Sequence, residues 1–234
     1  MSDKTVRLVI DEKEVSAKVG DTILRAATDN GIYIPTMCYL EGLSPWGGCR
    51  LCLTEVKGTP KLFPSCTTPV SEKMGVTTNS ERLKKYRKMV LELLLSERTH
   101  ICAVCVANGN CELQDMANRM GVDHVRIARA WTRYEVDSSH ERFTLDHNRC
   151  IMCTRCIRVC DEIEGVHTLD MMNRGKNSQI IVDLNQPWSS SQSCTSCGKC
   201  SAVCPVGSIY IKYKPISEVK KKELPSFILD RRQK

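Results

Sequence analysis

The chain has 234 residues, enough for one or two ordinary domains, and 41% of them are apolar when cysteine is included. Without its 15 cysteines the apolar share falls to roughly a third, below that of an average globular protein, and this predicts small cores that depend on bound metal. The sequence has no apolar run long enough to span a membrane and no secretory signal at its N-terminus, so we expect a cytoplasmic protein.

The cysteines are odd in number and lie mostly two or three residues apart. A reducing cytoplasm disfavours disulfides, whereas this close spacing suits metal ligation. We therefore predict metal centres rather than a disulfide framework, and the cysteines fall into four groups along the chain.

The first predicted elements form a small β-rich module. Residues 5–10 and 14–19 alternate or run apolar on either side of Asp11-Glu12-Lys13, which predicts a β-hairpin. Residues 20–30 predict a helix that Gly31 would end.

The first cysteine group follows that helix and consists of Cys38, Cys49, Cys52 and Cys66. Four cysteines with one close pair on a β-rich module suit a [2Fe–2S] cluster. Gly47 and Gly48 would let backbone N–H groups approach the sulfur atoms. All-cysteine tetrads are also common zinc sites, so zinc stays an alternative for this group.

A helical pattern begins at Asn79 or Ser80 and continues to about Glu97. Its apolar residues recur at three- and four-residue steps, at Leu83, Tyr86, Val90, Leu93 and Leu94. A shorter helix is expected over residues 112–120.

The second group, between these helices, has only three cysteines, Cys102, Cys105 and Cys111. His100 lies two residues before the first of them, and its imidazole is neutral near pH 7. Four clusters with four ligands each need one ligand more than the 15 cysteines provide, so we predict that His100 completes a [4Fe–4S] centre. The remaining histidines are expected to be structural: His124, His140, His147 and His167.

The third and fourth groups form an internal repeat. The first run is Cys150-x2-Cys153-x2-Cys156-x3-Cys160, and the second is Cys194-x2-Cys197-x2-Cys200-x3-Cys204-Pro205. In two-cluster ferredoxins the last cysteine of each run ligates the other cluster. We therefore assign Cys204 to the [4Fe–4S] centre of the first run and Cys160 to that of the second. A strand is expected over residues 209–213.

The formal charge of +7 does not indicate a nucleic-acid partner. Cluster ligands are thiolates, and the four oxidised clusters together would add roughly −7. Arg50, Arg155, Arg158 and Lys199 lie inside the cysteine runs and are expected to compensate buried anionic clusters. The Lys220–Lys222 run is expected to be a solvated basic face.

The order of these motifs resembles the N-terminal electron-transfer part of the large iron–sulfur subunit of NADH dehydrogenase (complex I). The resemblance covers residues 5–213 and includes Glu112-Leu113-Gln114 after the second group. The same module occurs in [FeFe]-hydrogenases, some formate dehydrogenases and the diaphorase of NAD(P)-linked [NiFe]-hydrogenases. The family usually has H-x3-C, which would place the histidine at Arg98, a residue that cannot ligate. The H-x-C spacing of His100 is similar to that of the hydrogenase diaphorase group.

The resemblance implies an α+β fold in three parts and a tail. These are a β-grasp [2Fe–2S] ferredoxin-like domain over residues 1–78, a helical domain with the His-ligated [4Fe–4S] cluster over 79–142, a bacterial-ferredoxin-like domain with two [4Fe–4S] clusters over 143–213, and a charged tail over 214–234. The sequence stops shortly after the second run, so we expect neither a molybdopterin-oxidoreductase-like region nor a hydrogenase H-cluster domain.

A chain of this length resembles the diaphorase small subunit of the bidirectional NAD(P)-linked [NiFe]-hydrogenase. By this resemblance it is a non-catalytic electron-transfer subunit of an oxidoreductase complex, without bound flavin or NAD. Its expected partners are an FMN-containing, NAD(P)-binding diaphorase subunit and the small and large [NiFe]-hydrogenase subunits, with hydrogen oxidation coupled reversibly to NAD(P) reduction. Alternatives are the equivalent subunit of an NAD-dependent formate dehydrogenase or a complex I-like NADH dehydrogenase, and, in a different class, a zinc-binding scaffold.

Overall fold

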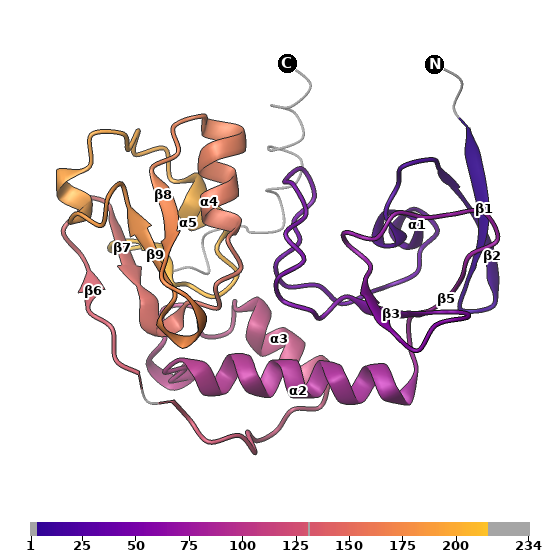
Figure 1. Cartoon of the computed structure of the whole chain (residues 1–234). Helices are drawn as coiled ribbons and strands as arrows, with labels where there is room; N and C mark the ends of the chain where they lie inside the picture. Colours follow the sequence, from indigo (N-terminus) through magenta and orange to yellow (C-terminus); the bar gives the residue numbers. More distant parts are fainter. Residues whose placement is uncertain (1–3, 131, 215–234) are drawn as a thin grey trace. The chain divides into compact units, whose positions relative to one another are not determined.

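The computed structural model describes residues 4–130 and 132–214, and the chain divides into two compact units (Figure 1). The first unit comprises residues up to 39 together with 45–90, and the second comprises residues 40–44 and those from 91 onward. The predicted tail lies, apart from residue 214, outside the described residues, as does the Lys220–Lys222 run. In the described part of the chain, no helix has the length and apolar character needed to cross a bilayer.

A mixed five-stranded sheet with the order β2-β1-β5-β3-β4 forms the first unit. Its strands are β1 (Thr5–Ile10), β2 (Lys13–Lys18), β3 (Leu53–Val56), β4 (Leu62–Pro64) and β5 (Gly75–Thr77). The predicted hairpin is confirmed, since β1 and β2 pair antiparallel from Thr5 with Lys18 to Ile10 with Lys13. The turn residues Asp11 and Glu12 both have positive φ, as a two-residue hairpin turn requires. β1 also pairs parallel with β5.

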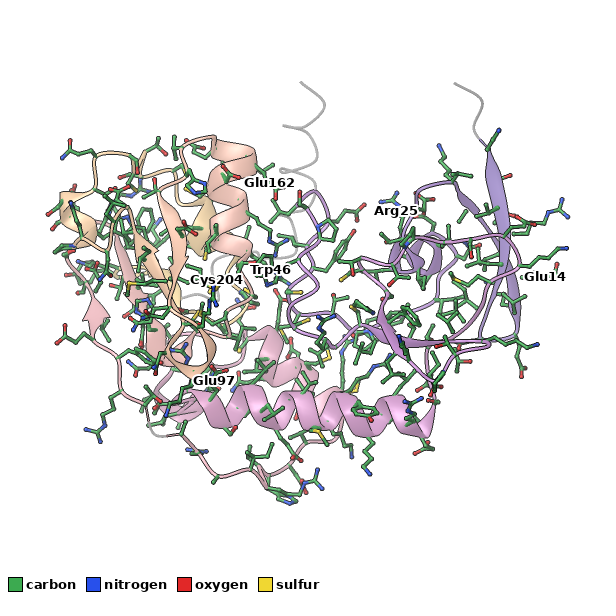
Figure 2. All side chains as sticks on the ribbon, in the orientation of Figure 1. Glu14, Arg25, Trp46, Glu97, Glu162 and Cys204 are labelled. Atoms are coloured by element: carbon green, nitrogen blue, oxygen red, sulfur yellow. The ribbon has the colours of Figure 1, made fainter. Side chains whose placement is uncertain are left out.

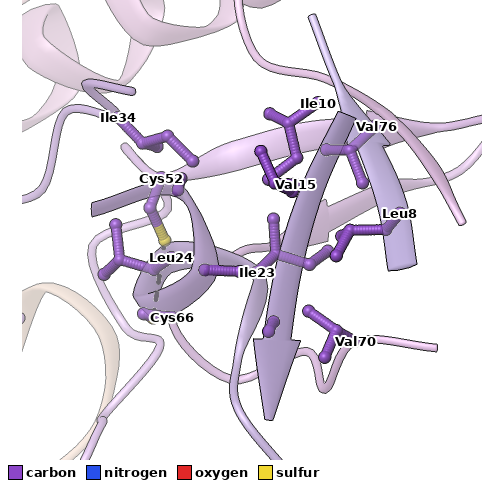
Figure 3. Packing of buried hydrophobic residues seen from close by; sticks show 13 residues of the cluster. Leu8, Ile10, Val15, Ile23, Leu24, Ile34, Cys52, Cys66, Val70 and Val76 are labelled. Carbon is purple, nitrogen blue, oxygen red and sulfur yellow. Dashed lines mark hydrogen bonds between the residues drawn. The ribbon is translucent and has the colours of Figure 1, made fainter. Parts of the chain in front are cut away.

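The core of the first unit lies between this sheet and helix α1 (Ile23–Asp29) (Figure 3). Alternate residues of β1 and β2 point inward because side chains alternate across a strand. The predicted helix is confirmed, and the side chain of Thr22 caps it by accepting a hydrogen bond from the Arg25 N–H. Two predicted cluster ligands, Cys52 and Cys66, are part of this core.

Helix α2 (Glu81–Glu97) follows, and Ser80 Oγ accepts a hydrogen bond from the Leu83 N–H at its start. Leu83 and Leu91 are buried on one side of the helix, but Tyr86 and Leu93 are exposed, contrary to the apolar periodicity. The buried Arg87 lies between the two leucines on that side.

Secondary structure in the second unit is short. Its elements are α3 (Glu112–Arg119), β6 (Val136–Asp137), β7 (Phe143–Asp146), α4 (Arg155–Val159), β8 (Leu169–Met172), β9 (Gln179–Val182), α5 (Lys199–Val203) and β10 (Ile209–Ile211). The strands form a β10-β7-β6 sheet and a β8-β9 hairpin. The predicted helix at 112–120 and the predicted strand at 209–213 are both present, the strand two residues shorter. α4 packs against α5, and a π-helical turn (Cys160–Glu164) continues α4.

Arg87 fixes the start of α2 to the first unit. Its guanidinium donates to the carbonyl oxygens of Leu51 at 3.1 Å, Leu53 at 3.0 Å and Thr78 at 2.8 Å. A buried acceptor left without a donor costs free energy, so these three contacts hold the loop that carries Cys49 and Cys52.

We expect Arg87→Met, which keeps much of the length but none of the donors, to destabilise the first unit by about 2–4 kcal/mol. Amide hydrogen exchange in α2 and β3 should become correspondingly faster. Lys88→Met, at the exposed neighbouring position, is the control. Equal protection from amide hydrogen exchange in Arg87→Met and Lys88→Met would contradict this role for Arg87.

Candidate iron–sulfur sites

The four cysteines of the first group come together in the first unit as two pairs. Sγ of Cys52 and Sγ of Cys66 lie 3.4 Å apart, and the Cys38 N–H donates to Sγ of Cys49 at 3.4 Å. Hydrogen bonding with Cys66 lowers the pKa of Cys52 to about 7. Each iron of a [2Fe–2S] rhomb takes two protein ligands, and the pairing of these thiols fits that requirement.

Backbone N–H groups approach the sulfur atoms of this site, and the Cys38 N–H bonds Sγ of Cys49. The side-chain contact with Cys38 and burial raise the pKa of Cys49, while the N–H groups of Leu51 and Cys38 act in the opposite direction. Gly47 has a φ of +68°, and a Cβ atom on Gly48 would overlap the indole of Trp46. The two glycines therefore shape the turn before Cys49.

The last cysteine of each ferredoxin-like run lies with the first three cysteines of the other run, as the repeat predicts. One cavity is lined by Cys150, Cys153, Cys156 and Cys204, and the last of these (labelled in Figure 2) comes from the segment after α5. A second cavity is lined by Cys160, Cys194, Cys197 and Cys200. The structure thus brings the two predicted ligand sets together, each around its own cavity.

The loops of the two runs share one backbone conformation. Met152 and Ser196 occupy equivalent positions and have φ of 50° and 55°, and Thr154 and Gly198 have φ of 58° and 79°. Alternating left-handed residues turn successive N–H groups toward one side, which makes a concave anion-binding backbone. The repeat in sequence is therefore also a repeat in loop geometry.

Burial makes these thiols reluctant to ionise without a metal. It raises the pKa of Cys150 to about 11 and that of Cys153 to about 12, and it raises the pKa of Cys156 well above the usual value. Metal binding would release these protons, because the ligand form of cysteine is the thiolate.

A third cavity is lined by His100, Cys102, Cys105 and Cys111. Nε2 of His100 is buried and has no hydrogen-bond partner among the residues that the structure describes, whereas the ring bonds to the Leu94 carbonyl through its other nitrogen. Burial lowers the pKa of His100 to about 4, so the imidazole is neutral with a free lone pair at pH 7. Metal-ligating histidines commonly donate their second N–H to a carbonyl in this way. These residues fit a cluster with one imidazole ligand.

Arg98, at the usual histidine position of the family, has a different role. It is buried, and its Nη2 donates to the Ser178 carbonyl at 2.5 Å. Its guanidinium carbon lies 4.2 Å from the ring centroid of Tyr134, a cation–π contact.

The thiols surround cavities and do not converge on single points. Across residues 4–130 and 132–214, no three His, Cys, Asp or Glu side chains are close enough to hold one metal ion. The structure thus gives three cavities, each lined by four of the predicted ligands, and one set of paired cysteines.

Three family models match the chain in succession. They are a 2Fe-2S iron-sulfur cluster binding domain at residues 3–81, the NADH-ubiquinone oxidoreductase-G iron-sulfur binding region at 87–126, and the ferredoxin-like domain of NADH-quinone oxidoreductase subunit 3 at 141–210. The chain carries iron–sulfur domains of the NADH-quinone oxidoreductase-G type. The first of these matches favours [2Fe–2S] over zinc for the first cysteine group.

Curated relatives agree with this assignment. The chain is 36% identical to the NADPH-Fe(3+) oxidoreductase subunit alpha of Geobacter sulfurreducens over 88% of its own length and 24% of that protein. It is 39% identical to the NADP-reducing hydrogenase subunit HndD of Solidesulfovibrio fructosivorans over 91% of its length and 37% of that protein. It therefore spans only about a quarter of the first of these relatives and somewhat more than a third of the second.

A solved structure matches over nearly its whole length. A chain of an NAD+-reducing [NiFe]-hydrogenase in the H2-reduced state is 29% identical, with a TM-score of 0.82, covering 91% of this chain and 89% of that one. The resemblance inferred from the motifs is confirmed, and so is the mixed α+β class.

The buried cations of the iron–sulfur runs have partners within the protein, which the sequence did not reveal. Arg155 makes a bidentate ion pair with Glu112 at 2.8 and 2.9 Å, and Lys199 pairs with Glu164. Arg50 is exposed. The expectation that all these residues compensate cluster charge is therefore too simple, because two of them already face carboxylates.

Two residues that sequence reasoning missed contact a predicted ligand. Trp188 Nε1 donates to Sγ of Cys194 at 3.3 Å, and Nε2 of His140 lies 4.0 Å from the same sulfur. The ring of Trp188 stacks on Phe143 and is buried. His140 also has structural contacts, since its Nε2 lies 3.1 Å from Ser196 Oγ and its Nδ1 accepts from the Arg142 N–H at 2.9 Å. The sequence shows only a tryptophan six residues before a predicted ligand, and its burial and its contact with the sulfur appear only in the fold.

Hydrogen bonds to cluster sulfurs raise the reduction potential by stabilising the more negative reduced state. We therefore expect Trp188→Phe, which keeps the aromatic packing, to lower the potential of the centre that contains Cys194 by a few tens of millivolts, roughly the worth of one hydrogen bond. EPR-monitored redox titration measures this, with the other centres as internal controls. An equal shift of all centres would indicate a general structural effect instead.

Proposed function

We propose that this chain is the electron-transfer subunit of an NAD(P)-linked [NiFe]-hydrogenase, with one [2Fe–2S] and three [4Fe–4S] clusters. The observation that carries the proposal is the gathering of the sixteen predicted ligands into four sets of four. The similarity of nearly the whole chain to a chain of an NAD+-reducing [NiFe]-hydrogenase supports the hydrogenase setting.

The proposed ligands follow from these sets. Cys38, Cys49, Cys52 and Cys66 hold the [2Fe–2S] cluster in a β-grasp domain. One [4Fe–4S] cluster is held by His100, Cys102, Cys105 and Cys111, another by Cys150, Cys153, Cys156 and Cys204, and the last by Cys160, Cys194, Cys197 and Cys200. When bound, the clusters supply one-electron redox chemistry.

The protein's own residues hold the three centres of the second unit next to one another. Val206 lines both the cavity of His100 and that of Cys150. α4 carries Cys156, and its π-helical continuation begins at Cys160, so one helical segment serves two centres. We infer an electron path that runs from the His100 centre through the Cys150 centre to the Cys160 centre, or the reverse.

By the same proposal the electrons come from, or pass to, an FMN-containing, NAD(P)-binding diaphorase subunit in the cytoplasm and the two [NiFe]-hydrogenase subunits. The chain itself contributes spacing, burial and hydrogen bonds to the clusters and binds no substrate.

Purified anaerobically, the chain should contain roughly 14 irons, with a matching amount of acid-labile sulfide. A tagged chain should co-purify with a flavoprotein and [NiFe]-hydrogenase subunits. A molybdenum enzyme or a quinone-reducing assembly in their place would favour the formate dehydrogenase or complex I alternative. Zinc without labile sulfide would overturn the proposal.

The His100 assignment has its own test. We expect His100→Cys to keep the cluster but lower its potential by on the order of 100 mV, because thiolate replaces a neutral imidazole. His100→Ala should lose this centre and its EPR signal, while His124→Ala, at an exposed histidine, should change neither. Unchanged iron content and EPR spectrum in His100→Ala would refute the assignment.

A further inference from the structure

Arg149 lines the cavity of the His100 centre, together with the four proposed ligands. It ends the 3₁₀ turn His147–Arg149, and the next residue, Cys150, lines the adjacent cavity. Arg149 thus lines the cavity of the His100 centre and directly precedes Cys150, a proposed ligand of the neighbouring centre.

The hydrogen bonds of this guanidinium are incomplete. Nε donates to Asp146 Oδ2 at 3.0 Å, whereas Nη1 is buried and has no hydrogen-bond partner within residues 4–130 and 132–214. Buried donors in folded proteins nearly always have an acceptor, and an unpaired one is costly. The cavity that Arg149 lines is where an acceptor belongs.

Asp146 orients Arg149. Its side chain is only 8% exposed, and its Oδ1 accepts bonds from the backbone N–H of Asn148 at 2.9 Å and from Nδ2 of Asn148 at 3.0 Å. A carboxylate fixed in this way holds Nε of Arg149. It does not occupy Nη1, which is left to donate to another acceptor.

We propose that Arg149 is a positioning residue for electron transfer: its Nη1 donates a hydrogen bond to a sulfur atom of the His100 centre, and its charge favours the reduced state of that centre. Reduction adds one electron and therefore one negative charge to the centre, and no proton is required. Arginine stays protonated throughout and stabilises the added charge. The inference rests on the proposed function, because it needs a cluster in the His100 cavity.

The test is an EPR-monitored redox titration, with dithionite as reductant, of the full chain and three variants. At the wild-type midpoint potential, Arg149→Gln should lower the ratio of reduced to oxidised His100 centre about tenfold, equivalent to 59 mV for one electron. Arg149→Lys, which keeps the charge, should recover part of this loss. Asp146→Asn, which removes the counter-charge, should raise the ratio.

Arg126→Gln is the matched control, because Arg126 belongs to the same unit but its side chain is 64% exposed and pairs with Glu92. It should leave every centre unchanged, and the [2Fe–2S] centre should not move in any variant. A merely structural role would not shift the potential in opposite directions in Arg149→Gln and Asp146→Asn.

An unshifted His100 centre in Arg149→Gln with full iron content would overturn the inference, as would shifts of equal sign in the two variants. If the Arg149→Gln protein does not assemble the His100 centre, the Asp146→Asn protein provides the test. An unshifted or lowered potential of the His100 centre in Asp146→Asn would then overturn the inference. Failure of the proposed function looks different, because the wild-type chain would then lack the signal of this centre and its iron.

Discussion

The convergence of sulfur ligands from distant parts of the chain governs the second unit. Cys160 and Cys204 each line a cavity with three cysteines of the other run, so neither run completes a site alone. Burial favours the protonated thiols there, and metal binding must displace those protons. Under the proposed function, cluster binding and folding are therefore coupled, which accounts for a unit of short helices and strands in a chain with few apolar residues.

Charge is distributed unevenly around these sites. Arg155 and Lys199 are buried beside carboxylates, and such pairs have little net charge to offer a cluster. Arg149 also bonds a carboxylate, that of Asp146, but its Nη1 is buried without an acceptor among the described residues, at the cavity lined by His100. Under the proposed function this is the centre with one thiolate fewer, so imidazole ligation and the arginine would act on its potential in the same direction.

The sequence was most informative where local chemistry determines geometry. Spacing alone grouped the cysteines. Counting them against four ligands per cluster singled out His100, because the number of cysteines is read directly from the sequence. Periodicity predicted helix α2 correctly but not every residue that it buries, since Arg87 is buried and Tyr86 is exposed. Nothing local predicts that an arginine will satisfy three carbonyls from distant loops. Trp188 and Arg149 were missed for the same reason, since their contacts exist only once the chain has folded.

Neighbouring cavities in the second unit are connected through residues that they share. Val206 lines two of them, and α4 with its π-helical continuation carries Cys156 of one ligand set and Cys160 of the next. Under the proposed function, each centre is thus linked to a neighbour by a shared lining residue or a shared helical segment. A shared wall also means that a charge such as that of Arg149 acts on two centres at once, more strongly on the one it lines. Under the proposed function, such residues would adjust the relative potentials along the path, and the overall direction of electron flow would depend on the partners at its two ends.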